Sequence, residues 1–288
     1  MAPRTDSTGR IVQERDRNQT QSLASLVQRL TPELARALPR HLTPDRMARI
    51  ALTALRVTPK LAECTAASFA GSLLSAAQLG LEVNTPMGHA WLIPRLIKPK
   101  NSPVGVMTCQ LQIGYQGAME LARRAGAKSI RAHEVRDGDE FSFELGLEPK
   151  LRHVPSGDAE REDRAVTASY AVATAPDGTR EFSVLTRPQI DARRRRSQAA
   201  QSGPWVTDFA EMAKKSAVLA LCKYLPRSAE LAQAHALEHA ADTGAQGAAY
   251  SPEVSAALLT EGLAADTVVE AVPEPASEPA VREPGADG

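Results

Sequence analysis

A strand followed at once by a helix occupies the centre of this chain and excludes a fold built from helices alone. Residues 107–113 alternate apolar and polar side chains, which is the two-residue period of a β-strand with one buried face. The apolar face holds Met107, Cys109, Leu111 and Ile113, and the opposite face holds Thr108, Gln110 and Gln112. From Tyr115 onward the apolar period becomes that of a helix, which Gly126 ends. The sequence therefore predicts a fold with both sheets and helices.

Cap and turn residues divide the rest of the chain into further elements. Thr43 predicts the start of one helix, and Thr65 predicts the start of another that Gly80 stops. Later helices are predicted from Thr186 and from Pro204. Strands are predicted in three antiparallel pairs: 89–96 with 104–113, 129–135 with 140–146 through an Asp137-Gly138 turn, and 165–174 with 180–185. Helices that flank β-hairpins and a small antiparallel sheet predict the α+β class, with a single core domain.

Charge is distributed unevenly along the 288 residues. The segment from Ser251 to the end holds eight of the 34 acids but only one of the 34 bases, which leaves 33 bases against 26 acids, or +7, in residues 1–250. A basic body with an acidic tail is common among proteins that handle nucleic acids. Composition predicts a flexible N-terminal arm at 1–30, a core at 31–235, and a disordered tail rich in Ala, Pro and Glu at 236–288.

Nothing in the sequence predicts a secreted or membrane-bound protein. No apolar run reaches the roughly 20 residues of a membrane helix, and the N-terminus has no apolar signal region. The three cysteines, Cys64, Cys109 and Cys222, form no CxxC pair, so neither a disulfide framework nor a thiolate zinc site is expected. A cytoplasmic location is the expectation.

Two glycines at the strand–helix junction require an explanation. Gly114 and Gly117 stand in "GYQG", which matches neither of the phosphate-binding patterns GxGxxG and GxxxxGK[ST], so no ATP or other nucleotide cofactor is expected. Gly117 lies in the first helical turn, where glycine costs about 1 kcal/mol against alanine. The pair therefore predicts a close approach, either of a DNA backbone or of a neighbouring segment.

Cationic side chains are the main candidates for contact with phosphates. The run Arg193–Arg196 is the densest charge in the chain, and arginine is a strong bidentate phosphate donor. On the last core helix, Lys215 and Lys223 are about 80° apart, while Lys214 lies opposite Lys223. Trp205 is either a base-stacking group or a hydrophobic anchor at a helix start.

One cluster of carboxylates leaves an enzymatic alternative open. Asp137, Asp139 and Glu140 are a conceivable metal site for a nuclease, although aspartate in a turn is expected for its turn chemistry alone. No metal site is predicted elsewhere, and no Ser/His/Asp arrangement is evident. The expectation is a binding protein rather than an enzyme, with Mg²⁺ at most modulating its action.

Several stretches, in the same order over about residues 35–230, resemble the RecT family of phage and prophage single-strand annealing proteins. They are "ALPRHLTPDRMARIALT", "SFAGSLLSAAQLGLE", "GHAWLIPR", "QLQIGYQGAMELARRAG", "VRDGDEFSFELGLEPKLRHVP", "TRPQI" and "GPWVTDFAEMAKKSAVLALCKYLP". Two features depart from the family pattern. The arginine run 193–196 is denser than usual, and Arg95 stands where an aromatic residue is more usual.

The resemblance implies a protein that coats single-stranded DNA, assembles into rings or helical filaments, and pairs complementary strands without ATP. It also implies a partner 5′→3′ exonuclease, and the acidic tail suggests a contact with that enzyme or with a single-strand-binding protein. On the basis of this resemblance, the expected DNA-binding residues are Tyr115, Arg123, Arg124, Arg152, Arg194, Trp205, Lys214, Lys215 and Lys223. A plain single-strand-binding protein remains an alternative, although an aromatic content of 4% is low for a stacking surface.

Overall fold

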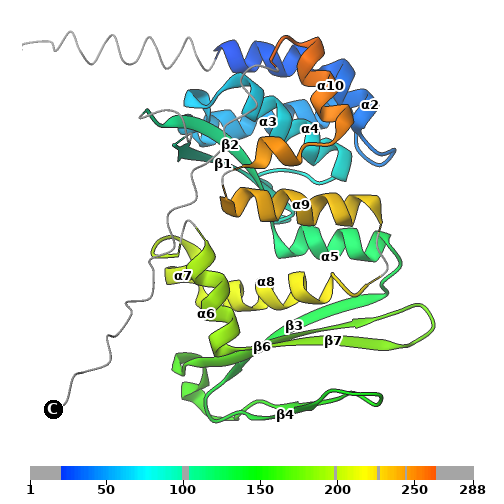
Figure 1. Ribbon diagram of the computed structural model, residues 1–288, viewed down its shortest axis with the longest axis vertical. Coiled ribbons are helices and arrows are strands. Elements are labelled where there is room, and N and C mark those ends of the chain that lie inside the picture. The colour runs from blue at the N-terminus through cyan, green and yellow to red at the C-terminus, as the bar shows by residue number, and fades with distance from the viewer. Residues whose placement is uncertain (1–20, 99–103, 198–199, 226–227, 244, 264–288) are drawn as a thin grey trace, which may run out of the picture.

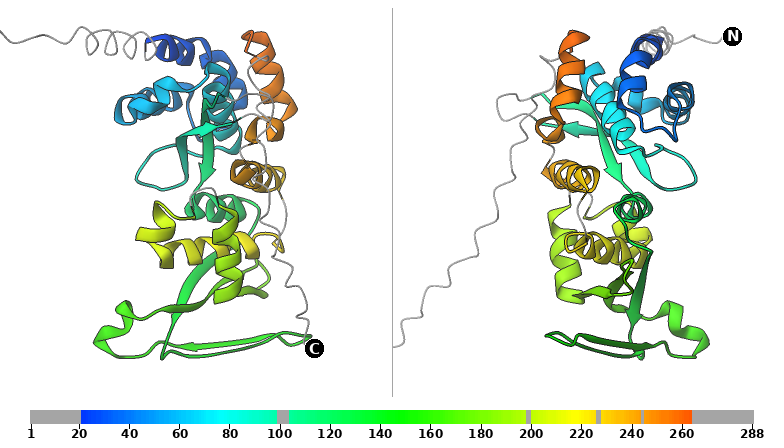
Figure 2. Two further views of the ribbon diagram at one scale, coloured as in Figure 1. Left: turned by 60° about the vertical axis from the view of Figure 1, so that its left-hand side comes forward. Right: turned by 90° about the vertical axis from the view of Figure 1, so that its right-hand side faces the viewer.

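The computed structural model describes residues 21–98, 104–197, 200–225, 228–243 and 245–263 (Figure 1). Helices and a β-ribbon form one end of the molecule, further helices cross the middle, and β-sheets form the other end (Figure 1). The two turned views in Figure 2 keep this order along the long axis. The α+β class with small antiparallel sheets flanked by helices is confirmed.

Helices dominate the first end. They are α2 (Thr31–Ala37), α3 (Pro44–Val57), the short η1 (Pro59–Glu63), α4 (Ala66–Leu79) and, from the far end of the chain, α10 (Pro252–Thr260). The predicted caps are confirmed, because the Thr43 and Thr65 side chains accept hydrogen bonds from the backbone N–H groups of Arg46 and Ser68. Gly80 ends α4 with a φ of 62°, which suits glycine.

The remaining helices lie between the ribbon and the sheets or beside them. They are α5 (Tyr115–Arg124), α6 (Arg187–Arg196), α7 (Pro204–Thr207), α8 (Phe209–Leu221), α9 (Ala229–Thr243) and the short η2 (Ala159–Asp163) and η3 (Gln246–Ala249). In Figure 1 α9, α5 and α8 cross the middle of the molecule one below the other. One large apolar core joins α5, α6, α7, α8 and α9 to α4 and to both strands of the ribbon, whereas η2 buries no residue.

Among the described residues, seven strands form three antiparallel sheets. The ribbon pairs β1 (Ala90–Ile97) with β2 (Val106–Ile113), and the three-stranded sheet has the order β3 (Ser129–Arg136), β6 (Val166–Thr174) and β7 (Arg180–Thr186). The third sheet pairs β4 (Glu140–Glu144) with β5 (Lys150–Val154). The predicted pairs β1–β2 and β6–β7 are confirmed.

The predicted pairing of residues 129–135 with 140–146 is wrong. A turn does lie at Asp137-Gly138, but β3 pairs with β6 and β4 pairs with β5. The carboxylate of Asp139 accepts hydrogen bonds from the backbone N–H groups of Arg136 and Ser156, each at 2.8 Å. These bonds tie the turn to the chain that follows β5, so β4 leaves the sheet instead of folding back along β3.

The glycine pair at the start of α5 accommodates a neighbouring segment. A Cβ atom on Gly114 would lie 2.0 Å from the carbonyl oxygen of Gly88, and one on Gly117 would lie 2.1 Å from that of His89. The Gly114 N–H also donates to the His89 carbonyl at 2.9 Å. The close approach predicted for these glycines is therefore filled by the backbone that enters β1.

The outer edge of β2 pairs with side chains instead of a third strand. On the α4 side, the Cys109 N–H donates to Ser68 Oγ at 2.9 Å, and Ser72 Oγ donates to the Cys109 carbonyl at 3.0 Å. Further along, the Leu111 N–H donates to Gln246 Oε1 at 2.7 Å, and Gln246 Nε2 donates to the Leu111 carbonyl at 2.6 Å. The edge is thereby unavailable to another strand.

The core extends beyond the predicted limits of 31–235 at both ends. Residues 21–29 are helical and bury Leu23 and Leu26, although they belong to the predicted N-terminal arm. At the other end, α10 buries Val254 and Leu258, although the tail was predicted to be disordered from 236. The predictions of disorder for 1–20 and 264–288 concern residues outside the described part. No helix among the described residues is long and apolar enough to cross a membrane.

Candidate nucleic-acid interface

One face of the β1–β2 ribbon is polar although the other packs into the core. Register places Trp91 opposite Gln112, Ile93 opposite Gln110, and Arg95 opposite Thr108. Because strand side chains alternate between faces, these six share one face, and the buried Leu92 and Leu111 lie on the other. Trp91 is 40% exposed. An accessible indole on the same face as a half-buried guanidinium is suited to nucleic acid, whereas Gln110 and Thr108 of this face are buried.

The arginine run of α6 is divided between structural and solvent-facing roles. Arg193 Nη1 donates to the Ser216 carbonyl of α8 at 3.2 Å, and burial lowers the pKa of this guanidinium. Arg194 Nε donates to the Ala200 carbonyl at 2.8 Å, so this predicted DNA contact stabilises the loop after α6. Arg195 and Arg196 are exposed, and no acid within the described ranges pairs with either. These two guanidiniums remain available to an anion.

The lysines of α8 do not form the side-by-side pair expected from the helical projection. Lys215 is buried, and its ammonium lies 3.3 Å from Glu238 Oε2 of α9. Lys214 pairs with Glu211 at 2.5 Å and with Glu134 at 3.8 Å. Because α8 ends at Leu221, the 80° angle expected between Lys215 and Lys223 on one helix does not apply. Lys223 is exposed and has no acid partner in the described part of the chain.

Three other predicted cations form structural contacts. Arg124 donates to the carbonyls of Leu79 and Gly80 at 2.9 and 3.1 Å, which caps the C-terminus of α4. It also pairs with Glu120 at 3.1 Å, and Arg123 lies 3.9 Å from the same carboxylate. On the β4–β5 hairpin, Arg152 forms an ion pair with Glu140. These surface pairs are weak, about 0.5 kcal/mol each, so a phosphate can displace the acids.

The two aromatic candidates mainly pack. Trp205 is buried, and its ring centroid lies 6.0 Å from that of Phe209, so it is a hydrophobic anchor at the start of α7. Tyr115 is half-buried at the start of α5 and packs against the main core. Residues 89–96 were predicted as a strand, but the apolar run from Ala90 to Pro94 does not alternate, so the sequence does not mark Trp91 as an accessible aromatic.

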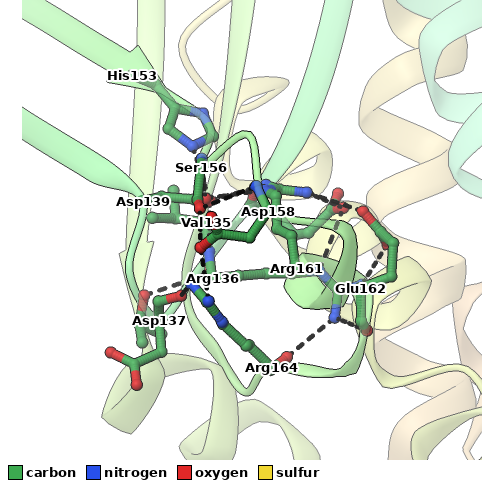
Figure 3. Close-up of polar contacts among 12 residues, drawn as sticks. Val135, Arg136, Asp137, Asp139, His153, Ser156, Asp158, Arg161, Glu162 and Arg164 are labelled. Carbon is green, nitrogen blue, oxygen red and sulfur yellow. Dashed lines mark hydrogen bonds and ion pairs between the residues drawn. The ribbon is translucent and has the colours of Figure 1, made fainter.

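Asp139, the central carboxylate of the nuclease alternative, is buried in a polar network (Figure 3). Its side chain has 0% exposure and accepts from Arg161 Nε at 2.8 Å and Arg161 Nη2 at 2.7 Å. The Asp139 carboxylate also accepts hydrogen bonds from the backbone N–H groups of Arg136 and Ser156, and His153 Nε2 lies 3.1 Å from Asp139 Oδ2. The Arg161 guanidinium, followed by the two backbone donors, holds the pKa of Asp139 well below its usual range.

This environment gives Asp139 a structural role. Its oxygens are already occupied by donors, and Glu140 is paired with Arg152. No cluster of three or more potential metal ligands occurs among the residues that the structure describes. The donor set of the proposed nuclease site therefore does not fit a metal ion.

The fold is α+β, and one face of its ribbon carries an exposed indole, Trp91, and a guanidinium, Arg95. The chain belongs to the RecT family, whose model matches residues 45–247. It is 48% identical to "Protein RecT" of Escherichia coli (strain K12) over 207 residues, which is 72% of this chain and 75% of that protein. It is 27% identical to "Uncharacterized protein YqaK" of Bacillus subtilis (strain 168) over 155 residues, or 54% and 49% of the two chains. Membership places the chain among proteins of DNA recombination and strand annealing.

Proposed function

We propose that this chain binds single-stranded DNA through Lys and Arg contacts with the phosphate backbone and anneals complementary strands without ATP. Phosphate contacts are independent of sequence and leave the base edges free to pair. The observation that carries the proposal is the group of guanidiniums without acid partners among the described residues, at Arg95, Arg195 and Arg196. An exposed indole at Trp91 adds a stacking group that tolerates any base.

The assembly and its partners are part of the same proposal. Subunits associate into rings or helical filaments, so that adjacent copies hold one strand extended. A 5′→3′ exonuclease supplies that single strand, and a single-strand-binding protein is a further partner. Mg²⁺ modulates binding by screening phosphates and takes no part in bond cleavage.

A strand-annealing assay tests the proposal directly. Two complementary oligonucleotides that carry a fluorescence donor and acceptor are mixed with the full chain, with and without ATP. We expect faster pairing than in buffer alone, the same rate without ATP, and binding that weakens steeply with salt. Binding without faster pairing would instead indicate a plain single-strand-binding protein. Shortened labelled DNA in the presence of Mg²⁺ would indicate a nuclease, and either result refutes the proposal.

Assembly requires a separate measurement. Sedimentation velocity and electron microscopy of the chain alone, with one strand, and with both strands should show growth from small species to rings or filaments when DNA is added. A monomer under all three conditions would contradict the oligomeric part of the proposal and leave the binding part intact.

A further inference from the structure

A small polar cavity lies where the ribbon, α6 and α9 meet. Its volume is about 20 Å³, and its lining includes Arg95, Gln110 and Gln112 from the ribbon, Ser197 from the end of α6, and Glu238 from α9. This volume admits one water-sized group, such as a single oxygen atom. The cavity therefore fits one atom of a ligand whose remainder lies outside.

Gln110 contributes a hydrogen-bond donor that lacks an acceptor. The residue is 3% exposed, and its Nε2 atom is buried with no hydrogen-bond partner among the described residues. A buried amide left in this state is costly, and native structures rarely keep one without reason. The side chain lines the cavity, so the missing acceptor belongs there.

The charge around the cavity specifies the kind of acceptor. Arg95 has no acid partner in the described ranges, so its positive charge is uncompensated. The one acid of the lining, Glu238, has its Oε2 atom 3.3 Å from the Lys215 ammonium, and its Oε1 atom accepts from the Ile113 N–H. Its charge is thereby balanced, which leaves a net positive lining. An anionic oxygen is preferred over a neutral carbonyl.

We infer that Arg95 and Gln110 form a subsite for a non-bridging oxygen of a phosphate group in a single DNA strand. Arg95 supplies the charge, and Gln110 Nε2 supplies a directional bond from within the ribbon. Trp91 lies on the same face, four residues along β1, where it can stack on a base beside that phosphate. The exposed Arg195 and Arg196 precede Ser197 of the lining and extend the positive surface.

This inference rests on the proposed function, because it names the phosphate contact that such binding requires. Its test measures binding of a labelled thymidine oligonucleotide to the full chain by fluorescence anisotropy. We expect Arg95→Ala and Gln110→Met each to weaken binding about tenfold, the size of a hydrogen bond to a charged group. Arg95→Ala should also reduce the slope of log affinity against log salt by about 0.7.

Matched variants separate this contact from general charge and from folding. Arg56→Ala removes an exposed cation on α3, and Gln201→Met changes an exposed glutamine in the same way as the test variant. Both should bind like the wild type. Circular dichroism and the unfolding midpoint show whether Gln110→Met folds. If Gln110→Met does not fold, Arg95→Ala alone tests the subsite, because Arg95 is more exposed and its replacement disturbs the fold less.

Modified probes identify the ligand atom. On an oligonucleotide with alternating neutral methylphosphonate linkages, the wild type should lose affinity and the two variants should lose much less. On an abasic oligonucleotide the variants should still be weaker than the wild type, because the contact is with phosphate. Equal binding by wild type and both variants would overturn the subsite while leaving DNA binding intact. Failure of the wild type to bind any strand would instead overturn the proposed function.

Inorganic phosphate carries the same anionic oxygens as the DNA backbone, so a separate competition experiment must distinguish the two ligands. Inorganic phosphate should compete with the oligonucleotide only weakly, since a strand is held at many linkages. If inorganic phosphate binds the wild type as tightly as the oligonucleotide does, and the variants leave the strand affinity unchanged, the cavity is a site for a free anion and the inference fails.

Discussion

The side-chain amide of Gln246 forms both strand-type hydrogen bonds with the backbone of Leu111, donating to its carbonyl and accepting from its N–H. Gln246 Nε2 also donates to the Leu237 carbonyl at 3.2 Å, so the amide is fixed from a second side. One side chain thus substitutes for a residue of a third strand. A segment far along the chain completes the ribbon that carries the candidate interface.

The Gln246→Leu substitution should destabilise the protein by about 2 kcal/mol, because it leaves a buried N–H and a buried carbonyl without partners. Urea unfolding measures the loss, and amide hydrogen exchange at Leu111 should become faster. Gln201→Leu is the control, since Gln201 is exposed. Equal midpoints for the wild type and Gln246→Leu would show that the amide does not hold the edge.

The Gly117→Ala substitution should cost about 3 kcal/mol, because the new methyl group overlaps the His89 carbonyl and the backbone must shift. Gly157 offers the matched control. A Cβ there meets nothing within 4 Å, so Gly157→Ala should change stability by less than about 0.5 kcal/mol. Thermal unfolding of both variants measures the difference, and similar midpoints would contradict the close approach.

The Asp139→Asn substitution should destabilise the protein by about 3 kcal/mol at neutral pH, because Arg161 is left without its buried partner. The pKa of Asp139 is depressed in the folded state, so its stabilisation is present above the unfolded-state value of about 3.9 and is lost as the pH falls below it. The two proteins should therefore converge in stability toward acid pH. Unfolding measured from pH 7 downward tests this, and a constant difference would refute the assignment.

The Glu238→Gln substitution should tighten the binding of single-stranded DNA by the folded protein several-fold, because it removes the negative charge opposite Lys215 and keeps an oxygen for the Ile113 N–H. It should also lower stability, because the buried Lys215 loses its partner. Glu211→Gln makes the same change in net charge beside Lys214, at a more exposed carboxylate. A smaller gain is expected there because solvent screens the pair. Equal gains would mean that net charge alone sets the affinity.

Local signals predicted most of the elements. The Thr43 and Thr65 caps and the Gly80 stop act over a few residues, and the structure confirms them, as it confirms a strand at Val106–Ile113. The single buried face predicted from the alternation is wrong, because Thr108 and Gln110 on the polar face are also buried. Strand pairing was predictable where a short turn joins the partners, as in β6–β7. It failed for β3, because its partner β6 lies beyond the intervening β4–β5 hairpin and the bonds of Asp139 redirect the chain.

The candidate site was harder to predict because ion pairing depends on distant segments. The sequence marks Lys215 as a cation on an apolar helix, but it does not reveal that Glu238 of α9 faces it. Arg124 was expected at a phosphate, and its role as a cap on α4 depends on a contact 45 residues away. Arg95 departs from the family pattern, but no local sequence pattern distinguishes an unpaired arginine from a paired one.

The side-chain pairing along β2 also has a consequence for synthesis. Gln246 lies 135 residues after Leu111, so a ribosome that has released the ribbon must still make nearly half the chain before that edge is closed. During this interval the nascent protein exposes unpaired backbone groups next to apolar surface, which is the condition under which chains associate wrongly. An expression fragment that stops before Gln246 would keep this edge open permanently and would also lack the packing of α10 against the core.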